Sequence, residues 1–111
     1  MAGAAIEIAD DQWDSEVLRA RIPVLVDFWG AACPPCRTLA PTIEKLAGDL
    51  QGRVKVVKVN TDQYIGVASR LRISAVPAVL IYKDGQEVHR MLGARPEAKY
   101  REALCANAGV C

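Results

Sequence analysis

The feature that most constrains the fold is a Cys-Pro-Pro-Cys segment at residues 33–36, which lies three residues after an apolar run at residues 24–29. The run is nearly continuously apolar, as is typical of a strand that is covered on both faces in a parallel sheet. Proline is tolerated in the first turn of a helix, where its missing N–H would have no partner, so Pro34 and Pro35 predict a helix start just after Cys33. The sequence therefore predicts a strand, a short turn and a helix that begins with two thiols.

We expect these two thiols to form a dithiol/disulfide switch with unequal roles. A Cys-x-x-Cys pair near a βαβ pattern indicates redox chemistry rather than half of a metal site. Cys33 would lie near the helix N-cap, where free N–H groups and the helix dipole lower the pKa of a thiol and favour the nucleophilic thiolate. Cys36 would lie one turn inside the helix, more covered and close enough to Cys33 to close a disulfide.

A zinc site is the alternative for the same pair, but it would need two further ligands. Cys105 and Cys111 are six residues apart near the end of the chain, and His89 stands alone in a predicted strand. No second metal-like spacing exists, so we expect no metal. We interpret Cys105 and Cys111 as incidental thiols, although either could form an intermolecular disulfide.

Length and composition predict one domain over residues 1–111, because 51% hydrophobic content is enough for a single core without cross-links. The 14 basic and 13 acidic residues are spread along the chain, which favours neither nucleic-acid nor anionic-membrane binding. No signal-peptide pattern occurs, and no apolar run approaches the roughly 18 residues of a membrane span. We therefore expect a cytoplasmic monomer, or a protein of an organelle stroma or matrix if a transit peptide has been removed.

The rest of the chain alternates between predicted strands and helices. Asp10 or Asp11 is expected to cap the first helix, Pro41 to kink the second, and Gly66 weakens the prediction of the third. Asp84-Gly85 predicts a tight hairpin and therefore an antiparallel pair of strands. The predicted strands are residues 6–8, 24–29, 54–59, 78–82 and 86–92, and the predicted helices are residues 10–19, 34–50, 62–71 and 96–107. The order is β-α-β-α-β-α-β-β-α.

Short motifs in a fixed order connect the chain to a known family. They are residues 26–29 before the cysteines, Arg37 after them, and then the segments 40–41, 76–77, 83–85 and Gly93. With this set, the sequence resembles the thioredoxins, and the resemblance covers residues 6–107, nearly the full chain. The resemblance implies an α/β thioredoxin fold with a central mixed five-stranded sheet flanked by four helices. The chain departs from the usual pattern at Ala32 and Pro34, where the family commonly has Trp and Gly, and at Ala78, where Thr is common.

The resemblance implies a thiol-disulfide oxidoreductase that acts as a general protein-disulfide reductase. Oxidised proteins would be its substrates, and an NADPH- or ferredoxin-dependent thioredoxin reductase would regenerate it. A disulfide oxidase or isomerase, and a non-catalytic partner-docking module, remain alternatives. We expect no cofactor, because the chain has no nucleotide-binding glycine motif.

Two charged strand residues are further candidates for the catalytic group. Asp27 has apolar neighbours on both sides, and a carboxylate buried without partners should have a raised pKa. The resemblance implies that Asp27 lies beneath the cysteines and moves a proton to or from Cys36, directly or through a water; the alternative is an Asp at a strand end that faces solvent. The resemblance also makes Lys58 a neighbour of Asp27, whereas it could equally be a strand lysine that reaches the surface.

The resemblance further implies a cis Val76–Pro77 bond that faces the cysteine pair, although most X–Pro bonds are trans. The Val76 backbone would then hydrogen-bond an extended substrate segment. The expected substrate-binding residues share an apolar character, although Trp29 could equally belong to the core; they are Trp29, Pro34, Pro35, Val76, Pro77, Gly93 and Ala94.

Overall fold

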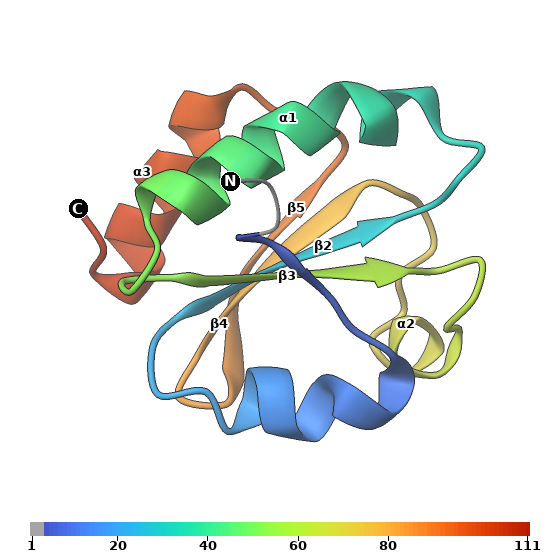
Figure 1. The fold of residues 1–111 in the computed structure, drawn as a ribbon, viewed down its shortest axis with the longest axis horizontal. Helices are drawn as coiled ribbons and strands as arrows, with labels where there is room; N and C mark the ends of the chain where they lie inside the picture. The colour runs from blue at the N-terminus through green and yellow to red at the C-terminus, as the bar shows by residue number, and fades with distance from the viewer. Residues whose placement is uncertain (1–3) are drawn as a thin grey trace.

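The computed structural model describes residues 4–111, so residues 1–3 of the predicted domain lie outside the described part of the chain. Five strands form one mixed sheet in the order β1-β3-β2-β4-β5 (Figure 1). β1, β3 and β2 are parallel, whereas β4 is antiparallel to β2 and β5 is antiparallel to β4. The strands are β1 Ile6–Glu7, β2 Val24–Trp29, β3 Lys55–Asn60, β4 Ala78–Lys83 and β5 Gln86–Leu92.

Helices cover both faces of this sheet. The long helices α1 (Pro34–Asp49) and α3 (Glu97–Ala108) lie on one face, and the short helix α2 (Gly66–Arg70) lies on the other (Figure 1). The first helical segment shares the face of α2 and consists of a 3-10 turn, Asp10–Gln12, followed by a π-helical stretch, Asp14–Leu18. The expected α/β order and the mixed five-stranded sheet are therefore confirmed. None of the helices within residues 4–111 is long and apolar enough to span a lipid bilayer.

Strand β2 forms the centre of the core because β3 and β4 flank it on both sides. Side chains along a strand alternate between the two faces of the sheet. Val24, Val26 and Phe28 therefore belong to the cluster under the first helical segment and α2, where Phe28 lies 6.0 Å from the ring of Trp13. Leu25 belongs to the cluster under α1 and α3. By the same alternation, Asp27 faces α1.

The helical segments differ from the sequence prediction in their caps. Neither Asp10 nor Asp11 caps the first segment, because the side chain of Gln12 accepts the N–H of Ala9 at 2.9 Å. Asp10 instead accepts the N–H groups of Gly66 and Val67 at 2.9 and 3.1 Å, so it caps α2 across the fold. The third helix is consequently shorter than the predicted 62–71.

The close approach of Asp10 also explains the glycine in α2. A Cβ atom added to Gly66 would lie 2.8 Å from Oδ2 of Asp10, so a larger residue would displace the capping carboxylate. The hairpin between β4 and β5 is as predicted: Asp84 and Gly85 both have positive φ angles, 53° and 78°, which a two-residue turn between right-twisted strands requires.

The end of the chain contradicts the interpretation of Cys105 and Cys111 as incidental thiols. The two residues form a disulfide within the chain, with Cα atoms 4.5 Å apart. The cause is a sharp turn after α3: Gly109 adopts a left-handed conformation with φ 72°, and the N–H of Val110 donates to the carbonyl of Leu104 at 3.1 Å. This reversal returns Cys111 to the side of Cys105.

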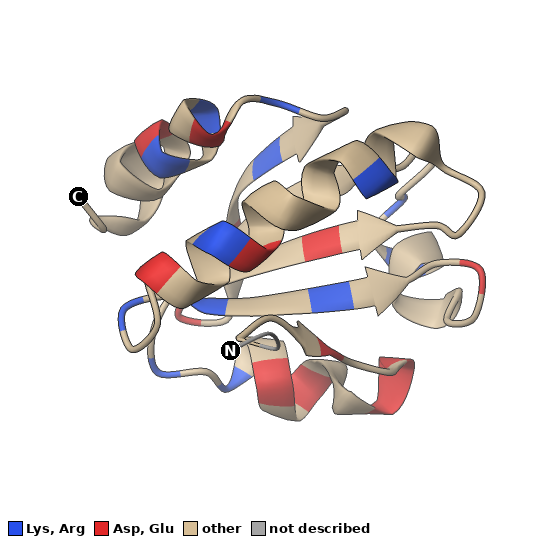
Figure 2. Ribbon diagram, turned by 45° about the horizontal axis from the view of Figure 1, so that its top comes forward, with Lys and Arg blue, Asp and Glu red and all other residues tan. Residues whose placement is uncertain are grey.

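Charged residues of both signs are interspersed along the ribbon, and acidic residues are concentrated on the first helical segment (Figure 2). The ion pairs on α1 and α3 connect the two helices: Asp49 lies 2.9 Å from Lys45 and 2.7 Å from Arg101. These groups are solvent-exposed to a large extent, so each pair contributes little to stability.

Replacing Asp10 by Ala should lower the free energy of unfolding by about 1 kcal/mol, because two N–H groups at the start of α2 would lose their acceptor. Asp11→Ala is the matched control, since it removes the same group from the exposed neighbouring position. Urea denaturation of both variants tests the prediction, and equal effects of the two substitutions would contradict it.

Candidate redox site

The predicted helix start is confirmed, and the two cysteines there are bonded to each other. Cys33 is the N-cap of α1, with Pro34 and Pro35 as its first residues. Cys33 and Cys36 form a disulfide with Cα atoms 5.2 Å apart, and the N–H of Cys36 donates to Sγ of Cys33 at 3.2 Å. Within residues 4–111, no three His, Cys, Asp or Glu side chains are grouped as metal ligands.

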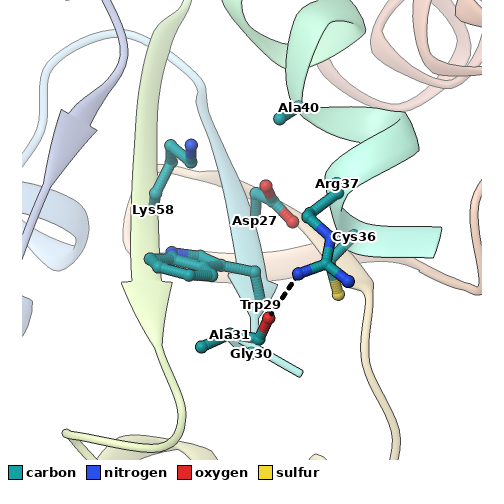
Figure 3. A pocket seen from close by; sticks show the side chains of 8 residues that line it. All are labelled: Asp27, Trp29, Gly30, Ala31, Cys36, Arg37, Ala40 and Lys58. Atoms are coloured by element: carbon teal, nitrogen blue, oxygen red, sulfur yellow. Dashed lines mark hydrogen bonds between the residues drawn. The ribbon is translucent and has the colours of Figure 1, made fainter. Parts of the chain in front are cut away.

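The turn before Cys33 is held by two charged side chains that the sequence interpretation did not include in the site. The N–H of Ala31 donates to Oδ2 of Asp62 at 2.8 Å. Nη1 of Arg37 donates to the carbonyl of Ala31 at 3.2 Å (Figure 3). The N–H and the carbonyl of Ala31 are thus each bound by a charged side chain. Arg37 stood among the motif residues, but Asp62 lies 31 positions away and only the fold brings it to the turn.

Cys33 lies against the segment before β4. Its Sγ is 3.6 Å from the carbonyl oxygen of Val76, and the Val76–Pro77 bond is cis, as the resemblance implied. The N–H of Gly93 donates to the carbonyl of Pro77 at 2.9 Å, which places the end of β5 beside the same segment. Residues separated by 60 positions in the sequence therefore meet around the disulfide.

The expected substrate-binding residues differ in exposure. Pro34, Pro35, Gly93 and Ala94 are exposed, Val76 is half-buried and Pro77 is buried. Trp29 is also half-buried and lies on the β3 side of the disulfide, where its Nε1 donates to Oε1 of Glu7 at 3.3 Å. Trp29 is accordingly part of the cavity described next.

A cavity of about 280 Å³ separates the end of β2 from the first turns of α1 (Figure 3). It connects Asp27 with Cys36, while Cys33 does not line it. The two cysteines are about equally buried, with 7% and 5% exposure, so their neighbours distinguish them better than their accessibility does. The remaining lining residues are Trp29, Gly30, Ala31, Arg37, Ala40 and Lys58.

Asp27 is a carboxyl group in an environment that disfavours its charge. Asp27 is only 1% exposed, and none of the described residues provides a hydrogen-bond partner for its Oδ1 atom. Burial raises the pKa of Asp27 from 3.8 to about 7, while the positive charge of Lys58 opposes the rise and the negative charge of Glu7 adds to it. A group with this pKa exchanges its proton near neutral pH.

Lys58 lies beside Asp27 because the two residues are paired in the parallel register of β2 and β3. Its side chain is 16% exposed, with Nζ 5.6 Å from the centre of the Trp29 ring. Nζ also lies 3.8 Å from Glu7 and 3.9 Å from Glu44. Lys58 is therefore a largely covered residue of the cavity wall, and the two glutamates are partners that the sequence interpretation missed.

Comparison with known proteins agrees with this geometry. The thioredoxin family model matches residues 4–106. Thioredoxin 1 of Nostoc sp. is 43% identical over 101 residues, which cover 91% of this chain and 94% of that protein. Thioredoxin 1 of Synechococcus elongatus is 44% identical over 100 residues, covering 90% and 94%. The chloroplastic M-type thioredoxin of Spinacia oleracea is 36% identical over 98 residues, covering 88% of this chain and 54% of that protein.

The match extends over most of the chain and includes the disulfide at the start of α1. The protein is therefore a thiol-disulfide oxidoreductase of the protein-disulfide reductase type, with Cys33–Cys36 as its redox-active pair. The chain belongs to the thioredoxin family.

Proposed function

We propose that the chain reduces disulfides of other proteins in two exchange steps, in which Cys33 attacks and Cys36 resolves. The observation that carries this assignment is the asymmetry of the pair: Cys33 faces Val76 near exposed residues, whereas Cys36 lines the cavity of Asp27. The N–H of Cys36 and the positive end of the α1 dipole favour a thiolate at Cys33.

The steps balance as a two-electron exchange. The Cys33 thiolate attacks one sulfur of the substrate disulfide, and the other sulfur leaves as a thiolate that takes up a proton. Cys36 then loses its proton and attacks Sγ of Cys33, which releases the second substrate thiol. The substrate gains two electrons and the chain is left with the Cys33–Cys36 disulfide.

We assign to Asp27 the role of base for Cys36. Its pKa of about 7 is close to that of a thiol, so the proton transfer between the two groups is nearly balanced. The cavity of about 280 Å³ between them has room for a water molecule that would relay the proton. Lys58 would support the charged form of Asp27 through its positive charge.

The substrate would bind as an extended segment along the exposed surface around Cys33. Backbone groups of Val76 would hydrogen-bond this segment, and the flanking apolar residues would contact its side chains. Ala32 is exposed and small where the family commonly has Trp, so the contact surface lacks a large apolar side chain at this position. The contact residues would be Trp29, Pro34, Pro35, Pro77, Gly93 and Ala94.

We further propose a thioredoxin reductase as the electron donor, supplied by NADPH or ferredoxin. Relatives of the chain are named as thioredoxins of cyanobacteria and of chloroplasts, which favours a cytoplasmic or stromal protein in an electron-transport role. The near-neutral charge of +1 offers no electrostatic attraction for nucleic acid or anionic membranes, and we propose a monomer that binds neither.

Cys33→Ser and Cys36→Ser should each reduce the rate of insulin disulfide reduction to that of the chemical reductant alone. Only Cys36→Ser should accumulate a mixed disulfide with the protein substrate, because the attacking thiol is present and the resolving thiol is missing. Intact mass after acid quenching measures this species. Accumulation with Cys33→Ser instead would reverse the assigned roles.

Asp27→Asn should lower the reduction rate by on the order of tenfold or more above pH 7, where the wild-type carboxylate is charged and can accept a proton. Below about pH 6 the carboxyl group of wild-type Asp27 is mostly protonated, so the reduction rates of the wild type and Asp27→Asn should converge. Asp11→Asn, on the exposed surface, is the control. A wild-type pH profile in Asp27→Asn would contradict the assignment of Asp27 as the base.

Asp27 should also make stability depend on pH. Its pKa is about 7 in the folded chain and 3.8 when exposed, so the folded state binds the proton more tightly and stability falls as pH rises through this window. Asp27→Asn lacks this loss. The free energy of unfolding of Asp27→Asn minus that of the wild type should therefore be larger at pH 8 than at pH 4, by up to about 4 kcal/mol. Urea denaturation of the oxidised proteins measures it, and a constant difference would contradict the raised pKa.

A further inference from the structure

The second disulfide, Cys105–Cys111, lies far from the first. Cys33 precedes α1, whereas Cys105 and Cys111 line a cavity together with Leu50, the C-cap that follows α1. The 16 residues of α1 span about 24 Å at 1.5 Å per residue. Figure 1 shows the end of the chain on the opposite side of the molecule from the start of α1. A Cys33 thiolate therefore cannot reach this disulfide in its own chain.

This disulfide is accessible to another molecule. Both cysteines are exposed, unlike the pair at Cys33, and the cavity of about 340 Å³ that they line opens beside them. Arg53, Arg101 and Glu102 line the same cavity, and Arg101 is paired with Asp49 and Glu97 at 2.7 and 2.8 Å, so charges of both signs lie around the disulfide.

The backbone holds the two cysteines together by contacts other than the sulfur bond. The N–H groups of Gly109 and Val110 donate to the carbonyls of Cys105 and Leu104 at 3.2 and 3.1 Å. Val110 also packs against the core cluster under α1 and α3. Because none of these contacts involves a sulfur atom, they would keep the two thiols near each other after reduction, and the disulfide could open and close without unfolding of α3.

We propose that Cys105–Cys111 is a second redox centre, which takes two electrons from the Cys33–Cys36 dithiol of another copy of the chain. The Cys33 thiolate of the donor attacks one sulfur of the pair, and the other sulfur leaves and is protonated. Cys36 of the donor then attacks its own Cys33 and releases the second thiol. The donor ends with a Cys33–Cys36 disulfide and the acceptor with two thiols; the inference rests on the proposed attacking role of Cys33.

Two double variants separate donor from acceptor. The donor is the double variant Cys105→Ser/Cys111→Ser, which is reduced and then separated from the small-molecule reductant. The acceptor is the double variant Cys33→Ser/Cys36→Ser in its oxidised form. After mixing with a fivefold excess of donor, acid quenching and alkylation, intact mass should show two alkyl groups on most acceptor chains and a matching loss of donor thiols. Adding Cys36→Ser to the donor should instead trap a mixed disulfide between the two chains.

An acceptor that stays oxidised while the same donor reduces insulin would overturn the second centre and leave the proposed function intact. A donor that reduces neither protein would overturn both. If the acceptor variant does not give the cooperative urea transition of the wild type, the oxidised wild-type chain replaces it. Peptide mapping of that chain then locates the alkyl groups: alkylated Cys105 and Cys111 would support the second centre, and alkylation of Cys33 and Cys36 alone would exclude it.

Discussion

The burial of strand β2 on both faces is the constraint on which the rest of the structure depends. β3 and β4 pair with both edges of this strand, and helical segments cover both faces of the sheet. Every side chain from Val24 to Phe28 is consequently at most 1% exposed. Four of these five positions are apolar and stabilise the two core clusters by burial of hydrophobic surface. The fifth is Asp27, which alternation directs toward α1. The same burial that stabilises the sheet therefore raises the pKa of this carboxyl group.

Features that arise from neighbouring residues were predictable from the sequence. The apolar pattern located β2, the two prolines located the start of α1, and Asp84-Gly85 located the hairpin, because each signal acts within a few residues. The features that were missed are contacts across the fold. Asp10 resembles an N-cap of its own segment, yet it caps α2 56 positions away.

The redox site divides in the same way. Cys33 and Cys36 followed from spacing and context, and the cis Val76–Pro77 bond and the place of Asp27 followed from family resemblance. The hydrogen bond from Ala31 to Asp62 depends on turn geometry, and the glutamates near Lys58 depend on how the strands and α1 pack together. No pattern of neighbouring residues in the sequence predicts either contact. The Cys105–Cys111 bond was missed for a different reason: the left-handed turn at Gly109 reverses the chain within six residues, whereas the helical pattern alone suggested separate thiols.

The prolines of the active site have a direct electrostatic consequence at Cys33. Pro34 and Pro35 have no N–H groups, so the first amide that α1 can offer is that of Cys36, and it donates to Sγ of Cys33 at 3.2 Å. The next amide, of Arg37, donates to the carbonyl of Cys33 rather than to its sulfur. A residue with an N–H at position 34 would bring one more donor to this end of the helix. In this chain, a Cys33 thiolate therefore depends on one amide and on the dipole of α1, and both come from the helix that also carries the resolving thiol.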